Sequence, residues 1–175
     1  VDSCYLSSSL AVDLAKKYDA DLHVFHLTTE KEMELFTSGM IDGKKITAEV
    51  CVHHMLLNDS YYPELGNQIK CNPSIKTEND RQALIKSLKE DKIDIIATDH
   101  APHTWDEKMQ DYKDAPAGLP LVQHGLQILM DFYHKDILSL ETIVEKTSHN
   151  VAKRFQVKDR GYIREGYYAD LAVLD

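Results

Sequence analysis

The stretch that decides the fold is Ala97-Thr98-Asp99-His100-Ala101-Pro102-His103, which follows the short apolar run Ile93-Asp94-Ile95-Ile96. An apolar run of this length that ends at polar residues is typical of a buried strand. The chain therefore delivers an aspartate and two histidines to the carboxyl end of a strand. In parallel α/β proteins, catalytic and binding residues gather at this edge of the sheet.

Strands and helices alternate on the amino-terminal side of this stretch. Periodicity and turn residues predict strands over residues 21–27, 46–53, 68–72 and 93–98, and helices over residues 10–18, 30–38 and 77–89. Thr77 is the expected cap of the last helix, with Asp80 in its first turn. On the carboxyl side we expect helices over residues 119–133, 140–145 and 150–155, then a turn and a strand over residues 161–175. This alternation favours right-handed βαβ units and a parallel sheet.

Each predicted strand ends at a residue that could carry chemistry. These residues are His26, His53, Asn72 and Asp99, at intervals of 27, 19 and 27 residues. Intervals of this size suit one strand–helix unit each, and four such units make half of a (β/α)8 TIM barrel, which typically needs about 250 residues. The sequence therefore predicts an α/β fold that amounts to half of such a barrel.

The strand-end residues suggest a metal-assisted hydrolase. Zinc accepts imidazole nitrogen, so His26 and His53 are candidate ligands. Asp99 could be a further ligand, a general base, or both. The structural alternatives are hydrogen-bonded core or surface histidines and a turn aspartate. His54 is expected to face the opposite side of the strand from His53, and so not to share a metal with it.

Two further residues are candidate substrate contacts. Asn72 could present its amide to a substrate, although Asn before Pro73 is also a common start of a turn. His103 could contact a substrate or be an ordinary polar loop residue. The polar segment of residues 104–118 that follows is long enough to be a substrate loop.

Composition narrows the class of protein. The chain has 175 residues and a net charge of −9, which argues against a nucleic-acid partner. No apolar run approaches the roughly 20 residues of a membrane span. The cysteines, Cys4, Cys51 and Cys71, are odd in number and widely spaced, which predicts reduced thiols in a cytoplasmic protein. The chain enters a helix directly from Val1, which suggests a piece of a longer protein.

Taken together, the motifs resemble the amidohydrolase superfamily and, within it, the bacterial zinc-dependent dihydroorotases. His26-Leu27-Thr28-Thr29 resembles the histidine motif of barrel strand five. Glu49-Val50-Cys51-Val52-His53-His54 resembles the strand-six motif, whose first histidine binds metal. Lys70-Cys71-Asn72-Pro73 resembles the strand-seven motif with a substrate-binding asparagine. Ala97-Thr98-Asp99-His100-Ala101-Pro102-His103 resembles the strand-eight motif with the catalytic aspartate, and it is the most specific of the four.

The resemblance implies a fold, a reaction and a set of roles. Residues 1–155 would form the second half of the barrel, strands five to eight, and residues 156–175 would enter a small β-sandwich domain. Zinc, as one or two ions, would be held by His26, His53 and Asp99, with Asp99 also catalytic. Asn72 and His103 would bind the carboxylate of a small-molecule substrate, dihydroorotate, which interconverts with N-carbamoyl-L-aspartate in pyrimidine biosynthesis. The resemblance is also compatible with a homodimer of the intact protein.

The sequence also departs from the family pattern. The His-x-His motif of strand one and strands two to four have no counterpart here, so we expect the chain to need the first half of the barrel. Alone, it should bind zinc weakly and show little or no activity. The alternatives are a hydantoinase or allantoinase, a catalytically inactive dihydroorotase-like structural partner, and an unrelated α/β binding domain.

Overall fold

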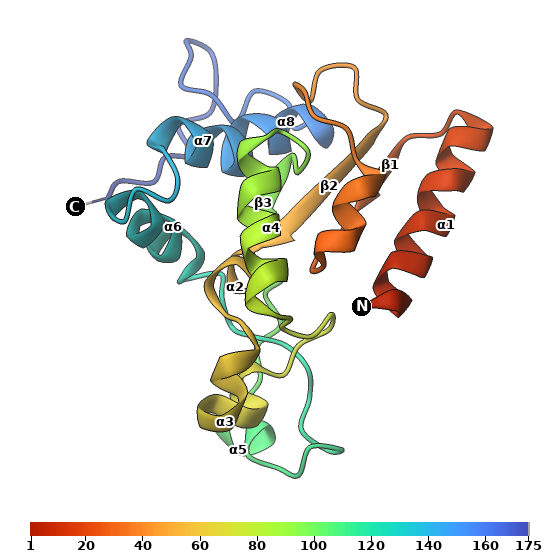
Figure 1. Ribbon diagram of the computed structural model, residues 1–175. Helices are drawn as coiled ribbons and strands as arrows, with labels where there is room; N and C mark the ends of the chain where they lie inside the picture. The colour runs from red at the N-terminus through yellow and green to blue at the C-terminus, as the bar shows by residue number, and fades with distance from the viewer. Residues whose placement is uncertain (175) are drawn as a thin grey trace.

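The computed structural model describes residues 1–174, and a small parallel sheet lies at its centre (Figure 1). Leu22 of the first strand is paired with Ile46 of the second, and Glu49 of the second is paired with Ile95 of the third. An α/β fold with parallel strands is thereby confirmed. The strands, in their order across the sheet, are β1 (Leu22–Val24), β2 (Ile46–Cys51) and β3 (Ile95–Ala97).

Helices flank this sheet. In Figure 1, α1 lies beside β1 at one side of the molecule, and α6 and α7 lie at the other. The α-helices are α1 (Asp2–Tyr18), α2 (Val52–Leu56), α3 (Tyr62–Leu65), α4 (Glu78–Lys89), α5 (Trp105–Lys108), α6 (Gly125–His134), α7 (Leu140–Val144) and α8 (Asn150–Arg154). The 3-10 helices are η1 (Glu30–Leu35), η2 (Asp59–Tyr61) and η3 (Gly66–Ile69), and one π-helical turn, η4 (Glu145–His149), joins α7 to α8.

The core forms where the helices meet the sheet. Its centre contains Leu27, Val50, Met55, Leu88 and Ile93, each at most 1% exposed. Burying one such side chain is worth about 1.5–3 kcal/mol relative to leaving it exposed. β2 and β3 are largely buried, as parallel strands covered on both faces are expected to be.

Local sequence signals explain two of the helical segments. Thr77 caps α4: its side chain accepts the N–H of Asp80, and the Asp80 carboxylate accepts the N–H of Thr77 at 3.2 Å. The same reciprocal arrangement joins Thr29 and Glu32 at the start of η1. The prediction for residues 77–89 is confirmed. The helix predicted over residues 30–38 is instead a shorter 3-10 helix.

The strand predicted over residues 68–72 is wrong. Its first part is η3, and the carbonyl of Lys70 accepts hydrogen bonds from Gly118 N and Lys108 Nζ, both at 2.9 Å. β2 pairs directly with β3, so residues 52–94 form a single crossover between neighbouring strands. The described chain thus holds three parallel strands, not four. Which barrel strands these are stays a prediction.

The carboxyl-terminal segment contains turns. The strand predicted over residues 161–175 is absent from the described part, residues 161–174. Arg160 Nε instead pairs with the Asp170 carboxylate at 2.6 Å. The division at residues 155 and 156, and the small β-sandwich, remain predictions.

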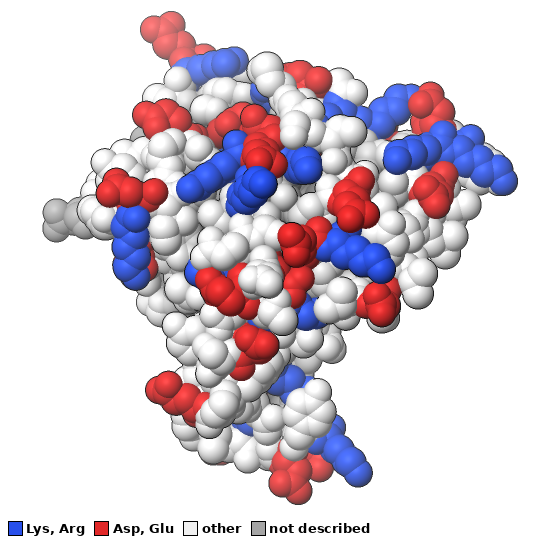
Figure 2. Space-filling view, in the orientation of Figure 1, with Lys and Arg blue, Asp and Glu red and all other residues white. Residues whose placement is uncertain are grey.

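Two surface properties bear on partners. Within the described residues, no helix has the length and apolarity needed to cross a membrane. Figure 2 shows basic and acidic side chains interspersed over one face of the molecule, with no broad basic patch on that face.

Candidate functional site at the carboxyl ends of the strands

Three of the predicted site residues occupy equivalent places in the sheet. His26, His53 and Asp99 each lie two residues beyond the last residue of their strand, which is Val24, Cys51 or Ala97. Parallel strands end at the same edge, so the three side chains start from one side of the molecule. The charges of both His26 and Asp99 affect the pKa of His53, which places all three within electrostatic reach.

The backbone is unusual at two of these positions. His26 has a φ of 41° and Asp99 a φ of 45°, both in the left-handed region. That conformation costs of order 1–3 kcal/mol in a residue other than glycine and clusters at functional sites. Asp99 is exposed and His26 partly exposed, so both side chains are accessible at the sheet edge.

His53 and His54 are buried beneath this edge. His53 is 1% exposed. Among residues 1–174, neither of its ring nitrogens has a hydrogen-bond partner, and Nδ1 of His54 also lacks one. An unsatisfied buried polar atom costs about 1–3 kcal/mol, so three such atoms together point to a ligand. Burial lowers the pKa of His53 to about 4, while the charge of Asp99 acts to raise it. The imidazole is therefore neutral near pH 7, the form that binds metal.

One group of metal-capable side chains is compact. Ligand atoms of Cys51, His53 and His54 all lie within 4.8 Å of one another. Burial, followed by the charges of Glu49 and Asp99, raises the pKa of the Cys51 thiol, so the sulfur is protonated in the metal-free protein. The two histidines give this edge the nitrogen donors that zinc accepts. The donor chemistry thus fits a metal, with His53 as the residue common to this group and to the predicted ligand set.

Sequence reasoning missed Cys51 and His54. The expectation that His54 faces away from His53 assumed that β2 continues through both residues. The strand ends at Cys51, and α2 begins at Val52. Consecutive helical residues are about 100° apart rather than 180°, so both imidazoles remain on the same side. The adjacent His-His pair itself was the available signal.

Asn72 and His103 lie in the loops beyond the sheet edge. His103 Nε2 is 3.2 Å from the carbonyl oxygen of Ala117. Asn72 is exposed and lies two residues after Lys70, whose carbonyl accepts the N–H of Gly118. The two predicted substrate contacts therefore flank the same segment, residues 104–118.

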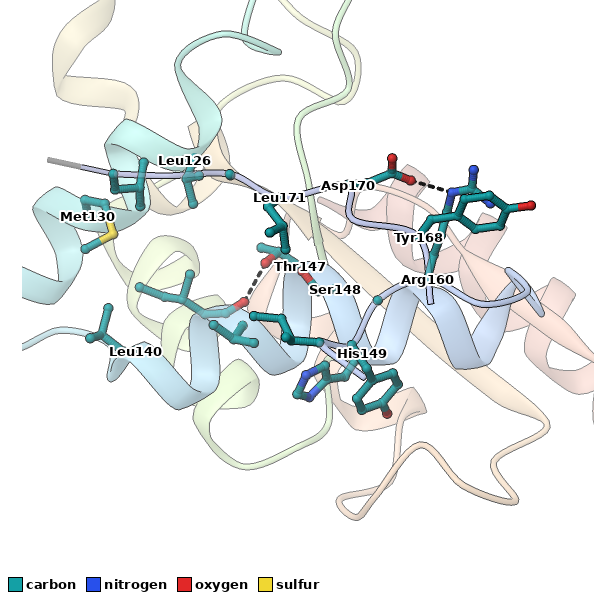
Figure 3. A pocket seen from close by; sticks show the side chains of 17 residues that line it. Leu126, Met130, Leu140, Thr147, Ser148, His149, Arg160, Tyr168, Asp170 and Leu171 are labelled. Atoms are coloured by element: carbon teal, nitrogen blue, oxygen red, sulfur yellow. Dashed lines mark hydrogen bonds and ion pairs between the residues drawn. The ribbon is translucent and has the colours of Figure 1, made fainter. Parts of the chain in front are cut away.

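One apolar cavity lies away from these residues. A cavity of about 500 Å³ is lined by residues of α6, α7, η4 and the carboxyl-terminal segment, among them Leu126, Ile143 and Leu171. Figure 3 shows its largely apolar wall, where Thr147 donates to the carbonyl of Ile143 at 2.7 Å. None of the predicted site residues lines this cavity, so it is separate from the strand-end site.

Known proteins resemble this chain over most of its length. A dihydroorotase from Carboxydothermus hydrogenoformans is 37% identical over 94% of this chain and 38% of that protein. A dihydroorotase from Ligilactobacillus salivarius is 38% identical over 97% of this chain and 40% of that protein. This chain therefore spans about two-fifths of the length of these relatives.

Solved structures show the same fold. An L-hydantoinase (dihydropyrimidinase) from Arthrobacter aurescens superposes with a TM-score of 0.82 at 24% identity, over 93% of this chain and 37% of that one. A dihydroorotase from Saccharomyces cerevisiae, in complex with 5-fluoroorotic acid, gives a TM-score of 0.77 at 19% identity over 87% of this chain and 43% of that one. The model of the amidohydrolase family matches residues 11–175, and the chain belongs to that family.

Proposed function

We propose that this chain is the later half of the barrel of a zinc-dependent dihydroorotase. The intact enzyme would interconvert dihydroorotate and N-carbamoyl-L-aspartate in pyrimidine biosynthesis. The observation that carries the proposal is the equivalent position of His26, His53 and Asp99, each of which lies two residues beyond the end of a parallel strand. Relatives named dihydroorotase, at 37% and 38% identity, support the choice of substrate.

The metal would be held by His26, His53 and Asp99. His53 supports this assignment because its ring nitrogens are buried and have no partner within the described residues. A zinc ion at this edge would polarise the amide carbonyl and activate a water molecule near neutral pH. The remaining ligands would come from the first half of the barrel, so residues 1–175 alone should bind zinc weakly and have little or no activity.

Asp99 would transfer a proton from the attacking water to the ring nitrogen. Its exposed carboxylate can accept a proton from the attacking water and pass it to the ring nitrogen as the C–N bond breaks. The oxygen of that water ends in the new carboxylate of N-carbamoyl-L-aspartate. The reverse sequence closes the ring and releases water.

Asn72 and His103 would recognise the carboxylate that dihydroorotate already carries. An amide N–H and an imidazole N–H both donate to a carboxylate oxygen. Both residues flank residues 104–118, which would close one side of the substrate site.

A hydantoinase is the second candidate, because the fold superposes on an L-hydantoinase with a TM-score of 0.82. A catalytically inactive structural partner is the third. A single assay separates all three: loss of ultraviolet absorbance during hydrolysis of dihydroorotate, hydantoin and allantoin by the intact, zinc-supplied protein. Turnover of dihydroorotate alone supports the proposal. Turnover of hydantoin or allantoin alone supports the second candidate, and a folded protein that hydrolyses none supports the third.

A further inference from the structure

Lys108, the last residue of α5, is a buried lysine whose partners are backbone carbonyls. It is 6% exposed. Its Nζ atom donates to the carbonyl oxygens of Lys70 at 2.9 Å, Pro116 at 3.0 Å and Gly118 at 3.0 Å. An ammonium group has three N–H donors and no acceptor, so three carbonyls match its charged form. Burial lowers the pKa of this ammonium, but each of its protons is used.

Lys70 makes matching contacts in the opposite direction, from its own segment to the loop that contains Lys108. Lys70 Nζ donates to the carbonyl of Tyr112 at 2.6 Å and to that of Ala115. The carbonyl of Lys70 accepts both Lys108 Nζ and the N–H of Gly118, each at 2.9 Å. Each lysine therefore binds carbonyls on the other's segment. In Figure 1, α3 and α5 accordingly lie together beyond one end of the sheet.

These contacts surround the two predicted substrate contacts. His103 Nε2 lies 3.2 Å from the carbonyl oxygen of Ala117, between the two loop carbonyls that Lys108 binds. On the other segment, Asn72 is two residues beyond Lys70. One ammonium group thus joins the backbone beside Asn72 to the backbone beside His103.

Gly118 and Leu119, at the end of this loop, also contact Ala101 in the segment that follows Asp99. A Cβ atom on Gly118 would lie 2.5 Å from Cβ of Ala101 and 2.7 Å from its carbonyl oxygen. The N–H of Ala101 donates to the carbonyl of Leu119 at 3.1 Å. A displacement of the loop would therefore be transmitted to the segment between Asp99 and His103.

We propose that Lys108 is a positioning residue for recognition of an anionic substrate. It ties the backbone beside Asn72 to the backbone beside His103 and so fixes the separation of these two residues. This inference rests on the proposed function and deepens it.

The test compares Lys108→Met with Lys113→Met in the intact, zinc-loaded enzyme. Methionine keeps the aliphatic stem but removes the Lys108 donor from the carbonyls of Pro116 and Gly118, and leaves the Lys70 carbonyl with the N–H of Gly118 alone. Lys113 is exposed on the same loop and is the matched control. Because unsatisfied buried acceptors are costly, K108M should raise KM for dihydroorotate about tenfold or more. The kcat value should change less than about threefold, since no group that moves a proton is removed. Zinc content should be unchanged, and K113M should behave as the wild type.

Two further measurements test the role of Lys108 independently of turnover. Binding of orotate, a carboxylate-bearing analogue, is measured by titration calorimetry, and amide exchange at Gly118 is followed in both variants. If K108M does not fold, Lys70→Met replaces it, and it should also weaken orotate binding and speed exchange at Gly118. Unchanged KM and orotate affinity in the variant that folds would overturn the assignment. Loss of kcat at unchanged KM would overturn it as well.

Failure of the proposed function would look different. A wild-type enzyme that hydrolyses no dihydroorotate overturns the dihydroorotase assignment. In that case, weaker orotate binding by K108M than by K113M would still support the role of Lys108.

Discussion

The Nε2 atom of His54 lies 2.9 Å from the carbonyl oxygen of Pro73. A carbonyl can only accept, so Nε2 carries the proton and Nδ1 keeps its lone pair in the neutral ring. His54 is buried in α2, and Pro73 follows the predicted substrate contact Asn72. The contact thus joins the base of the candidate metal site to the segment that would bind substrate.

The buried imidazoles predict a loss of stability in acid. Burial lowers the pKa of His53 to about 4 and that of His54 well below its usual value. Between the unfolded value near 6.5 and the folded value, the unfolded chain binds more protons, so stability is present above about pH 6.5 and lost as the pH falls towards 4. The slope should approach about 1.4 kcal/mol per pH unit for each histidine.

Denaturant titrations of the metal-free protein between pH 4 and 7.5 check this prediction. His53→Gln should remove about half of the slope. His124→Gln, at an exposed position, is the control and should leave it unchanged. A wild-type protein with no slope in this range would contradict the prediction.

Asp99→Asn should abolish most of the turnover. The amide cannot accept the proton of the attacking water, and general acid–base catalysis is worth about 10²–10⁴-fold. We expect kcat of the intact enzyme to fall by that factor, with the thermal midpoint close to that of the wild type because Asp99 is exposed. Near-normal turnover would remove Asp99 from the mechanism.

His103→Ala should act mainly on binding. The ring would donate to the substrate carboxylate, and hydrogen bonds to charged groups are worth about 1.5–3 kcal/mol, so KM for dihydroorotate should rise about tenfold or more. The kcat value should change less. His134→Ala, at the exposed end of α6, is the matched control. Steady-state kinetics on dihydroorotate measure both values, and an unchanged KM would contradict this role.

Zinc content should distinguish the two donor sets that share His53. If His26, His53 and Asp99 hold the metal, His26→Ala and His53→Ala each lower the zinc retained by the intact protein after dialysis, whereas Cys51→Ser does not. Metal analysis of the three purified variants checks this. Zinc loss in Cys51→Ser with retention in His26→Ala would instead favour the compact group of Cys51, His53 and His54.

Breaking the buried ion pair between Lys44 and Asp94 should destabilise the protein. The Asp94 carboxylate is 1% exposed and accepts Lys44 Nζ at 2.8 Å and the N–H of Ala48 at 3.0 Å. Lys44→Met leaves a buried charge unpaired and should lower the free energy of unfolding by about 3–5 kcal/mol.

The neighbouring lysine provides the control. Lys45 pairs with Asp19 at the surface, where the side chains are 51% and 82% exposed. Lys45→Met should therefore cost at most about 1 kcal/mol. Chemical denaturation of the two variants measures the difference, and equal losses would contradict the importance of burial at Asp94.

Local patterns predicted much of the secondary structure. The capping of α4 by Thr77 depends on residues three apart, and the helices after the sheet follow their apolar spacing. The position of Asp99 just beyond a strand was also predictable, because a short apolar run ended by polar residues marks a strand end. The strand predicted over residues 21–27 included His26, which the structure places two residues beyond the end of β1.

The segment around Lys70 shows where local patterns are insufficient. Residues 68–72 alternate as a strand would, but a strand requires a neighbouring strand with which to pair. Here β2 pairs with β3 directly, and the Lys70 carbonyl is bonded to Lys108 and Gly118 instead. A two-residue difference in where β2 ends, at Cys51 rather than His53, likewise decides whether His53 and His54 face apart or together.

The sequence by itself determined the alternation of strands and helices, the motifs of the amidohydrolase family and the candidate residues at the strand ends, since these depend on spacing along the chain. Only the tertiary structure decided that three strands form the sheet, that His53 and His54 share a buried site, and that Lys108 is buried. The physical reason is that these features depend on hydrogen-bond partners distant in sequence: Lys108 and its acceptor Lys70 are 38 residues apart.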